Sequence, residues 1–278
     1  MARLDLHLHS THSDGVRPPE WVVQQAAANG AELLALTDHD TLAGVELARA
    51  EGRRQGLDVV AGVEISVHDP ELGELHVLGY FSTEAPLAEF EAQLTAYRTE
   101  RESRALRTVE RLNQLGRPIE YEQVVRIAHG ASIGRPHIAR ALVETGQVES
   151  VQEAFDRYLH NGGPAYVPRT LLSLAESLQM IHDAGGFSSL AHPTRHPDPL
   201  AAVEAFAAAD GQGVEIYYRN DTREEVANGE QLARRLGLIP TVGSDFHGLH
   251  PDELRPASVP VPEPAANQLI DILKGLGA

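Results

Sequence analysis

Residues 31–66 read AELLALTDHDTLAGVELARAEGRRQGLDVVAGVEIS, two apolar runs on either side of an amphipathic one. The first run, 31–40, predicts a buried strand, and 57–66 predicts a second one. The stretch between them predicts a helix that ends at Gly56, because glycine readily adopts the left-handed conformation of a helix C-terminus. Strand, helix and strand in this order predict two parallel strands in a sheet that the helix covers.

The same alternation continues along most of the chain. Further strands are predicted at 2–9, 74–81, 186–193, 213–220 and 238–248, and further helices at 17–30, 199–211 and 222–237. Ser173 and Glu176 have the spacing of a capping box, which predicts the start of another helix. About seven strands, mostly separated by helices, imply a parallel sheet with helices outside it, either a closed barrel or an open doubly wound sheet. No glycine fingerprint for a dinucleotide follows the first strand, which weakens the open-sheet alternative.

The strand pattern is interrupted between about residues 84 and 165. A long helix is predicted at 87–116, and three shorter helices follow at 119–130, 135–146 and 150–163. We interpret 84–165 as a helical insertion and not as an independent domain. The remaining segments, 1–83 and 166–278, then form one barrel domain.

The composition narrows the class of protein. The 278 residues include 42% hydrophobic and 23% charged ones, which is typical of a globular protein, and the formal net charge is −17. That charge argues against binding long nucleic acid, which requires a basic surface.

No apolar run has membrane-spanning length and no signal-peptide profile begins the chain, so we expect a cytoplasmic protein that does not bind membranes. The absence of cysteine excludes disulfides and thiolate metal sites, so any metal ligands must be His, Asp or Glu. The oligomeric state is not indicated.

Ionisable side chains gather where the predicted strands end. In a βα barrel the C-terminal strand ends converge on one mouth, so residues distant in sequence would meet there. His76 differs, because it lies nearer the start of its strand. Nine candidate metal ligands result: His7, His9, Asp14, His39, Glu64, His76, His192, Asp245 and His247.

Each of these residues has a simpler interpretation when it is taken alone. His7 and His9 lie two residues apart on a strand, so both imidazoles face the same side. Taken alone, the pair could lie on the surface, lie in the core or bind a metal. Asp14 and Asp245 could be turn residues, Asp40 an N-cap, and His192 a core histidine. These simpler interpretations do not explain all nine residues together, because burying so many ionisable groups costs several kcal/mol unless they are paired. Nine ligands exceed the needs of one ion, and with a bridging carboxylate such as Glu64 they suit two or three.

The motifs DLHLHSTHSDG, LALTDHDTLAG, GVEIS, LHVLGY, AHP and GSDFHG resemble those of the PHP (polymerase and histidinol phosphatase) family of the amidohydrolase superfamily. The resemblance implies a distorted (β/α)7 TIM-like barrel whose helical insertion caps the active-site mouth. The segments IGRPHIARALVETG, YLHNGGPAYVP and LAHPTRH are closest to a branch that acts on 3′,5′-nucleoside bisphosphates or trims short 5′-phosphorylated RNA.

The resemblance also implies roles for individual residues. His7, His9, Glu64 and Asp245 correspond to a first metal site, Glu64, His76 and His192 to a second, and Asp14, His39 and His247 to a third. Arg135, His137 and Arg195 are implied as phosphate contacts, and Arg219 is a poorer candidate. Asp245, Glu64 and His192 are the implied catalytic residues, and Asp245 would orient or deprotonate the nucleophile.

We therefore expect a metal-dependent phosphoesterase that uses two or three divalent ions, Mn²⁺ first and Zn²⁺ or Fe²⁺ as alternatives. Its expected reaction is removal of the 3′-phosphate from a nucleoside 3′,5′-bisphosphate by a metal-bridging hydroxide. A 5′-3′ exoribonuclease acting on short RNA, a histidinol-phosphate phosphatase and a non-catalytic metal-binding scaffold are the alternatives.

Overall fold

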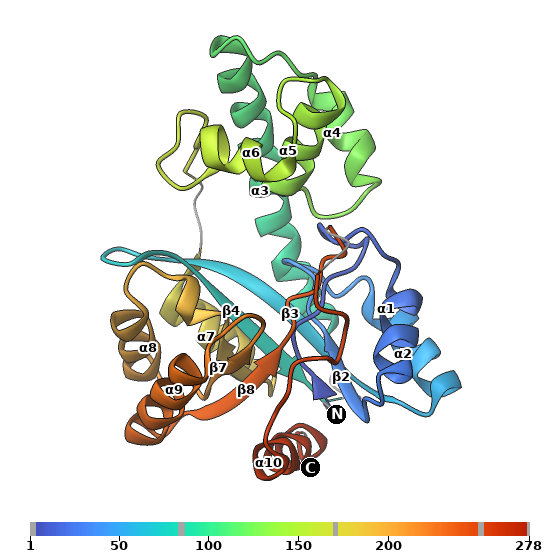
Figure 1. Cartoon of the computed structure of the whole chain (residues 1–278), viewed down its shortest axis with the longest axis vertical. Coiled ribbons are helices and arrows are strands. Elements are labelled where there is room, and N and C mark those ends of the chain that lie inside the picture. Colours follow the sequence, from blue (N-terminus) through green and yellow to red (C-terminus); the bar gives the residue numbers. More distant parts are fainter. Residues whose placement is uncertain (1–3, 83–86, 169–171, 250–252, 277–278) are drawn as a thin grey trace.

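The computed structural model describes residues 4–82, 87–168, 172–249 and 253–276 (Figure 1). Within these ranges, eight strands form one sheet, and seven of them follow one another in the order β1-β2-β3-β4-β6-β7-β8. Their bounds are Leu4–Asp5, Leu33–Leu36, Asp58–Asp69, Gly73–Phe81, Phe187–Leu190, Gly213–Tyr218 and Ile239–Gly243. The short strand β5 (Leu172–Ser173) pairs with β3 beside this path. The seven predicted strands are confirmed.

The sheet curls into a nearly closed barrel. The residues that follow β1 meet those in and after β8, where Leu6 N donates to Val242 O and His9 N to Phe246 O, both at 3.0 Å. Leu8 and Phe246 form a parallel bridge between the same two segments. The TIM-like barrel is therefore confirmed over the open sheet.

The expectation of a parallel sheet is wrong at one strand. β4 runs antiparallel to both of its neighbours, β3 and β6. No helix separates β3 from β4. Instead Asp69 Oδ1 accepts hydrogen bonds from the amides of Glu71 and Leu72 at 2.9 and 3.0 Å, which makes a tight turn. The start of β4 therefore lies beside the C-terminal ends of its neighbours, and His76, close to that start, faces the same mouth as the other candidate ligands.

Helices surround the barrel where the sequence places them (Figure 1). They are α1 (Pro19–Ala28), α2 (Val45–Gln55), α7 (Leu174–Asp183), α8 (Pro199–Ala208), α9 (Arg223–Leu236) and α10 (Glu263–Lys274), of which α10 was not predicted. Gly56 ends α2 with a φ of 69°, and Ser173 caps α7 by accepting a hydrogen bond from Glu176 N at 3.2 Å. In the described part of the chain, no helix combines the length and apolarity that crossing a bilayer requires.

The insertion consists of the four predicted helical segments. They are α3 (Ala88–Gln114), α4 (Tyr121–Ala128), α5 (Arg135–Glu144) and α6 (Val151–Ala154), which continues as a π-helix over Phe155–Leu159. Near its start, α3 contributes Phe90 and Leu94 to the barrel core. Further along, Val109 and Leu112 pack in a separate core with α4 and α5. One continuous helix thus contributes side chains to both cores, and Figure 1 shows it running from the barrel to α4 and α5. The predicted boundary at residue 84 lies outside the described residues, and the division into two parts stays a prediction.

Candidate metal centre

The barrel mouth brings the nine candidate ligands together from six strands and the segments that follow them. Among the described residues, four groups of three or four side chains place one ligand atom each within 4.8 Å of one another. These groups are His9, Asp14, His39 and His247; His7, His9 and Asp245; His7, Glu64 and His192; and His39, Glu64 and His76. Because the groups share members, they form one continuous cluster.

Glu64 occupies the middle of this cluster, and both of its carboxylate oxygens face imidazole nitrogens. Oε2 lies 3.1–3.3 Å from one nitrogen each of three rings, those of His7, His9 and His39. Oε1 lies 2.7 Å from His76 Nδ1 and 3.2 Å from His192 Nε2. Burial would raise the pKa of Glu64, but the surrounding histidines hold it well below its ordinary value. A carboxylate with two oxygens in two ligand groups is suited to bridging two cations.

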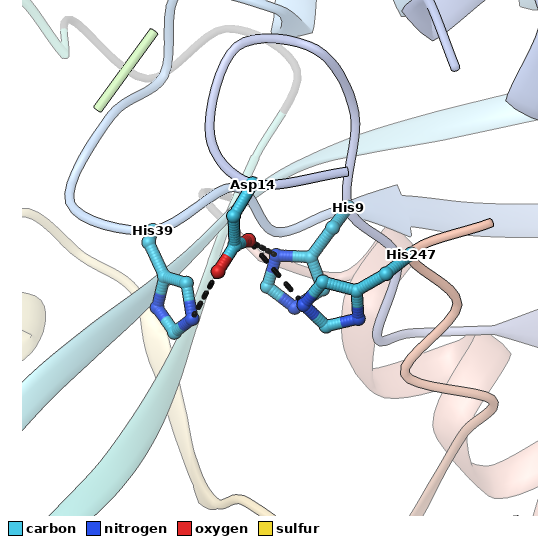
Figure 2. A group of neighbouring side chains, drawn as sticks. All are labelled: His9, Asp14, His39 and His247. Atoms are coloured by element: carbon cyan, nitrogen blue, oxygen red, sulfur yellow. Dashed lines mark ion pairs between the residues drawn. The ribbon is translucent and has the colours of Figure 1, made fainter. Parts of the chain in front are cut away.

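Asp14 gathers a further group on the other side of the cluster. Figure 2 shows its carboxylate between the ring of His39 and the rings of His9 and His247. The distances are 3.8 Å to His39 Nε2, 3.7 Å to His9 Nδ1 and 3.3 Å to His247 Nε2. Asp14 therefore does more than form a turn.

The donor set fits divalent cations. His7 Nε2, His9 Nε2, His39 Nδ1 and Glu64 Oε2 are buried and make no geometrically acceptable hydrogen bond, although they converge. Buried polar atoms are otherwise almost always hydrogen-bonded, so atoms of this kind that point at one another are typical of ligands around an ion. Imidazole and carboxylate donors are the ones that Mn²⁺, Zn²⁺ and Fe²⁺ accept.

Glu215 contacts two of the candidate ligands on the side away from the cluster, although it is not one of the nine residues predicted from the sequence. Its Oε1 lies 3.1 Å from His7 Nδ1, and its Oε2 accepts a hydrogen bond from His192 N at 2.7 Å. Gly243 allows this approach, since a Cβ there would lie 2.2 Å from Glu215 Oε1. A signal was present in the sequence, because GVEI occurs both around Glu64 and around Glu215.

We expect Glu215→Gln to weaken metal binding about tenfold to a hundredfold, because a carboxylate behind a ligating histidine fixes its tautomer and raises its basicity. The measurement is Mn²⁺ affinity by calorimetric titration. Glu230→Gln is the control. Glu230 lies on α9 and accepts a hydrogen bond from Tyr217, which is on the same strand as Glu215, but Glu230 is not part of the cluster. Wild-type affinity in Glu215→Gln would contradict this supporting role.

Two aspartates of the TDHDT motif have structural tasks. Asp38 accepts hydrogen bonds from Ser10 N at 2.7 Å and from Ser13 Oγ at 2.6 Å, so it orders the loop that carries His9 and Asp14. Asp40 is not the N-cap of α2, which is Gly44. It forms an ion pair with Arg101 of the insertion instead.

Asp245 is held from both sides. Its Oδ1 lies 3.4 Å from His7 Nε2 and 3.3 Å from His9 Nε2, while its Oδ2 accepts hydrogen bonds from Tyr218 Oη at 2.7 Å and Arg219 Nη2 at 3.0 Å. Burial would raise the pKa of Asp245, but His7 and His247 hold it well below its ordinary value. Arg219 thus holds Asp245 from the side opposite to the histidines.

A cavity of about 760 Å³ opens over the cluster, and residues of both the barrel and the insertion line it. Five arginines lie on its wall: Arg101, Arg104, Arg135, Arg195 and Arg219. Burial and the neighbouring charge of Arg135 lower the pKa of Arg104 to about 10. Two neighbouring guanidinium groups beside a cavity are suited to binding an anion.

The three implied phosphate contacts have different environments. Arg135 begins α5 and lines the cavity, where its Nη1 donates to Asn161 Oδ1 at 2.6 Å. Arg195 also lines the cavity and donates to Tyr218 Oη at 3.1 Å. His137 is not among the lining residues: it is buried, and its Nδ1 accepts a hydrogen bond from Gly134 N at 3.0 Å. Burial lowers the pKa of His137 to about 4, so it is neutral.

Comparison with known proteins agrees with this geometry. The family model of the PHP domain matches residues 5–166, more than half of the chain. The chain belongs to the PHP family. The 5′-3′ exoribonuclease of Haemophilus influenzae is 35% identical to this PHP chain over 250 residues, which are 88% of the chain and 90% of that protein. The 3′,5′-nucleoside bisphosphate phosphatase of Chromobacterium violaceum is 35% identical over 261 residues, 89% of the chain and 88% of that protein.

A solved structure is similarly close. An amidohydrolase from Chromobacterium violaceum, determined with bound sulfate and without metal, superposes with a TM-score of 0.87 at 32% identity, covering 98% of this chain and 97% of that one. Family membership and the ligand cluster make this PHP protein a hydrolase of the phosphoesterase class that depends on divalent metal.

Proposed function

We propose that the protein removes the 3′-phosphate from nucleoside 3′,5′-bisphosphates, such as adenosine 3′,5′-bisphosphate, and releases AMP and phosphate. The observation that carries this proposal is the pairing, in one cavity, of the metal-ligand cluster with a second cationic group on the insertion, Arg104 and Arg135. A substrate with two phosphates would place the reacting one at the cluster and the other on the arginines. The name of the Chromobacterium violaceum phosphatase supports the same substrate class.

The two phosphate positions are close to each other. Glu74 links them, since its Oε1 lies 3.8 Å from His76 Nε2 and its Oε2 lies 3.6 Å from Arg135 Nη2. Arg104 donates from Nε to Val167 O at 2.8 Å, which fixes its guanidinium at the cavity wall. A phosphate between Arg104 and Arg135 would relieve the repulsion that lowers the pKa of Arg104.

The cluster would hold two or three divalent ions, with Mn²⁺ as our first choice. When bound, they supply Lewis acidity for the phosphate and an acidified water. Glu64 and His192 act as ligands in this scheme, with Glu64 shared between ligand groups. Asp245 would orient the nucleophile through Oδ1, because Tyr218 and Arg219 hold its other oxygen by hydrogen bonds.

The direct test offers the Mn²⁺-loaded protein adenosine 3′,5′-bisphosphate, histidinol phosphate and a short 5′-phosphorylated RNA separately, with products identified by chromatography. We expect the bisphosphate to yield AMP and phosphate. Turnover of histidinol phosphate alone would overturn the proposal.

A second candidate function, 5′-3′ exoribonuclease activity on short RNA, is favoured by a second cavity of about 410 Å³. This cavity shares several lining residues with the first, His76 and His192 among them, and Tyr166 forms part of its wall. A nucleoside joined to the reacting phosphate could lie there, with its base near the tyrosine ring. The Haemophilus influenzae relative carries this activity in its name. A 5′-phosphorylated dinucleotide that is cleaved as fast as the bisphosphate would support it, and complete resistance would exclude it.

We expect Arg135→Ala to raise the KM for the bisphosphate about tenfold to a hundredfold and to leave bound metal unchanged. The reason is that a hydrogen bond to a charged group contributes about 1.5–3 kcal/mol. Steady-state kinetics and elemental analysis provide the two measurements. Arg126→Ala, an exposed arginine of α4 outside both cavities, is the control. Loss of metal in Arg135→Ala would show that its role had been misassigned.

A further inference from the structure

The insertion touches more than the substrate cavity, because one face of α3 also contacts the loop that follows β2. Glu91, Arg98 and Arg101 are spaced seven and three residues apart, so they lie on the same side of the helix. We call these three side chains the α3 clamp. The loop they contact, residues 40–42, comes directly after the candidate ligand His39.

The α3 clamp contacts both the backbone and the side chains of this loop. Arg101 pairs with the Asp40 carboxylate, and its Nη2 donates to Ser66 Oγ on β3 at 3.1 Å. Arg98 Nη1 donates to the carbonyl oxygen of Asp40 at 2.8 Å. Glu91 Oε2 accepts a hydrogen bond from Leu42 N at 2.8 Å. Arg101 is itself buried, with 8% of its surface exposed, so the Asp40 carboxylate is needed to compensate its buried positive charge.

The residue that the clamp holds has an unusual backbone conformation. Asp40 has a φ of 52°, in the left-handed region that residues with a Cβ atom seldom adopt. Its amide donates to Glu64 O at 2.9 Å, and His39 forms an isolated bridge with Glu64. A left-handed residue directly after His39 therefore sets the path of the chain that presents the His39 ring. That ring lies 3.3 Å from Glu64 Oε2 through Nδ1 and 3.8 Å from Asp14 Oδ2 through Nε2.

We propose that the α3 clamp consists of positioning residues for the metal centre. It holds Asp40 in the left-handed conformation that turns His39 toward Asp14 and Glu64, so the insertion completes the two ligand groups that include His39. The group formed by His7, His9 and Asp245 does not include His39 and does not depend on the clamp. This inference rests on the metal centre and is independent of the substrate proposed above.

The experiment measures Mn²⁺ stoichiometry and affinity, by calorimetric titration and by elemental analysis after gel filtration, with no substrate present. We expect Arg101→Met to lower the affinity for the ions that His39 would bind by about tenfold to a hundredfold. Ions held without His39 should stay bound. Arg101→Lys, which keeps the charge, should recover part of the affinity.

Action through His39 is tested by combining substitutions. His39→Ala alone should lose the same metal equivalents as Arg101→Met, and the double variant should lose no more than His39→Ala. Additive losses in the double variant, or wild-type metal binding in Arg101→Met, would overturn the proposal.

Two further variants separate positioning from folding. Arg98→Ala removes the contact with the Asp40 carbonyl without leaving a buried carboxylate unpaired. We expect it to lower the affinity for the same ions as Arg101→Met does, but by a smaller factor. Arg107→Ala is the matched control, because Arg107 is exposed on the same helix and faces away from the loop. Circular dichroism should show wild-type folding for both. Equal metal binding in Arg98→Ala and Arg107→Ala would contradict the clamp.

Discussion

Glu64→Gln is expected to lose metal binding by about a hundredfold to several thousandfold, and phosphoesterase turnover with it. Glu64 is almost fully buried and faces five histidine rings, so an amide in its place removes the charge on which the cluster converges. Removing one partner of a buried charged group typically costs about 3–5 kcal/mol, which corresponds to that range of affinity. Bound Mn²⁺ per chain and turnover of adenosine 3′,5′-bisphosphate are the measurements.

The control for this substitution is Glu204→Gln, which changes an exposed carboxylate paired with Arg235 on the outside of the barrel. It should leave both quantities unchanged. Full metal content in Glu64→Gln would mean that the ions are held elsewhere and that the bridging role is wrong.

Saturating Mn²⁺ is expected to raise the melting temperature of the chelator-treated protein by about 8–16 °C. Metal at a thousandfold excess over its dissociation constant stabilises the folded state by about 4 kcal/mol. Each kcal/mol raises the melting temperature of a domain of this size by about 2–4 °C. The gain arises because the ions pair buried imidazole and carboxylate atoms that otherwise make no hydrogen bond.

Differential scanning calorimetry with and without Mn²⁺ measures this shift. Glu64→Gln provides the comparison, since the same addition should move its melting temperature by only a small part of that amount. Identical melting temperatures of wild type with and without metal would contradict a buried metal centre.

Much of the fold was predictable because its signals are local. Apolar periodicity places the strands and helices, and the glycine after α2 and the Ser173–Glu176 capping box mark helix ends that the structure confirms. The convergence of eight of the nine candidate ligands, all except His76, was predictable for a related reason. Parallel strands carry their C-terminal ends to one mouth, so strand position in the sequence predicts proximity in space.

The direction of β4 was not predictable from strand periodicity, because an alternating or apolar run reads the same in either direction. The short turn at Asp69 reverses the chain, and only this reversal explains why His76, near a strand start, joins the other ligands. His137 shows a similar limit. Its motif resembles a phosphate-binding one, but whether an imidazole enters a cavity or caps a helix depends on how α5 packs.

The sequence by itself determined most of the strands and helices, though not β5 or α10, together with the ionisable groups at the strand ends and the PHP family to which the chain belongs. Tertiary structure alone decided that Glu215 stands behind His7 and His192, and that Arg98 and Arg101 reach the residue after His39. The physical reason is separation along the chain. Periodicity and capping act over a few residues, whereas these contacts join groups 23 to 208 residues apart and exist only once the barrel has closed and α3 has packed against it.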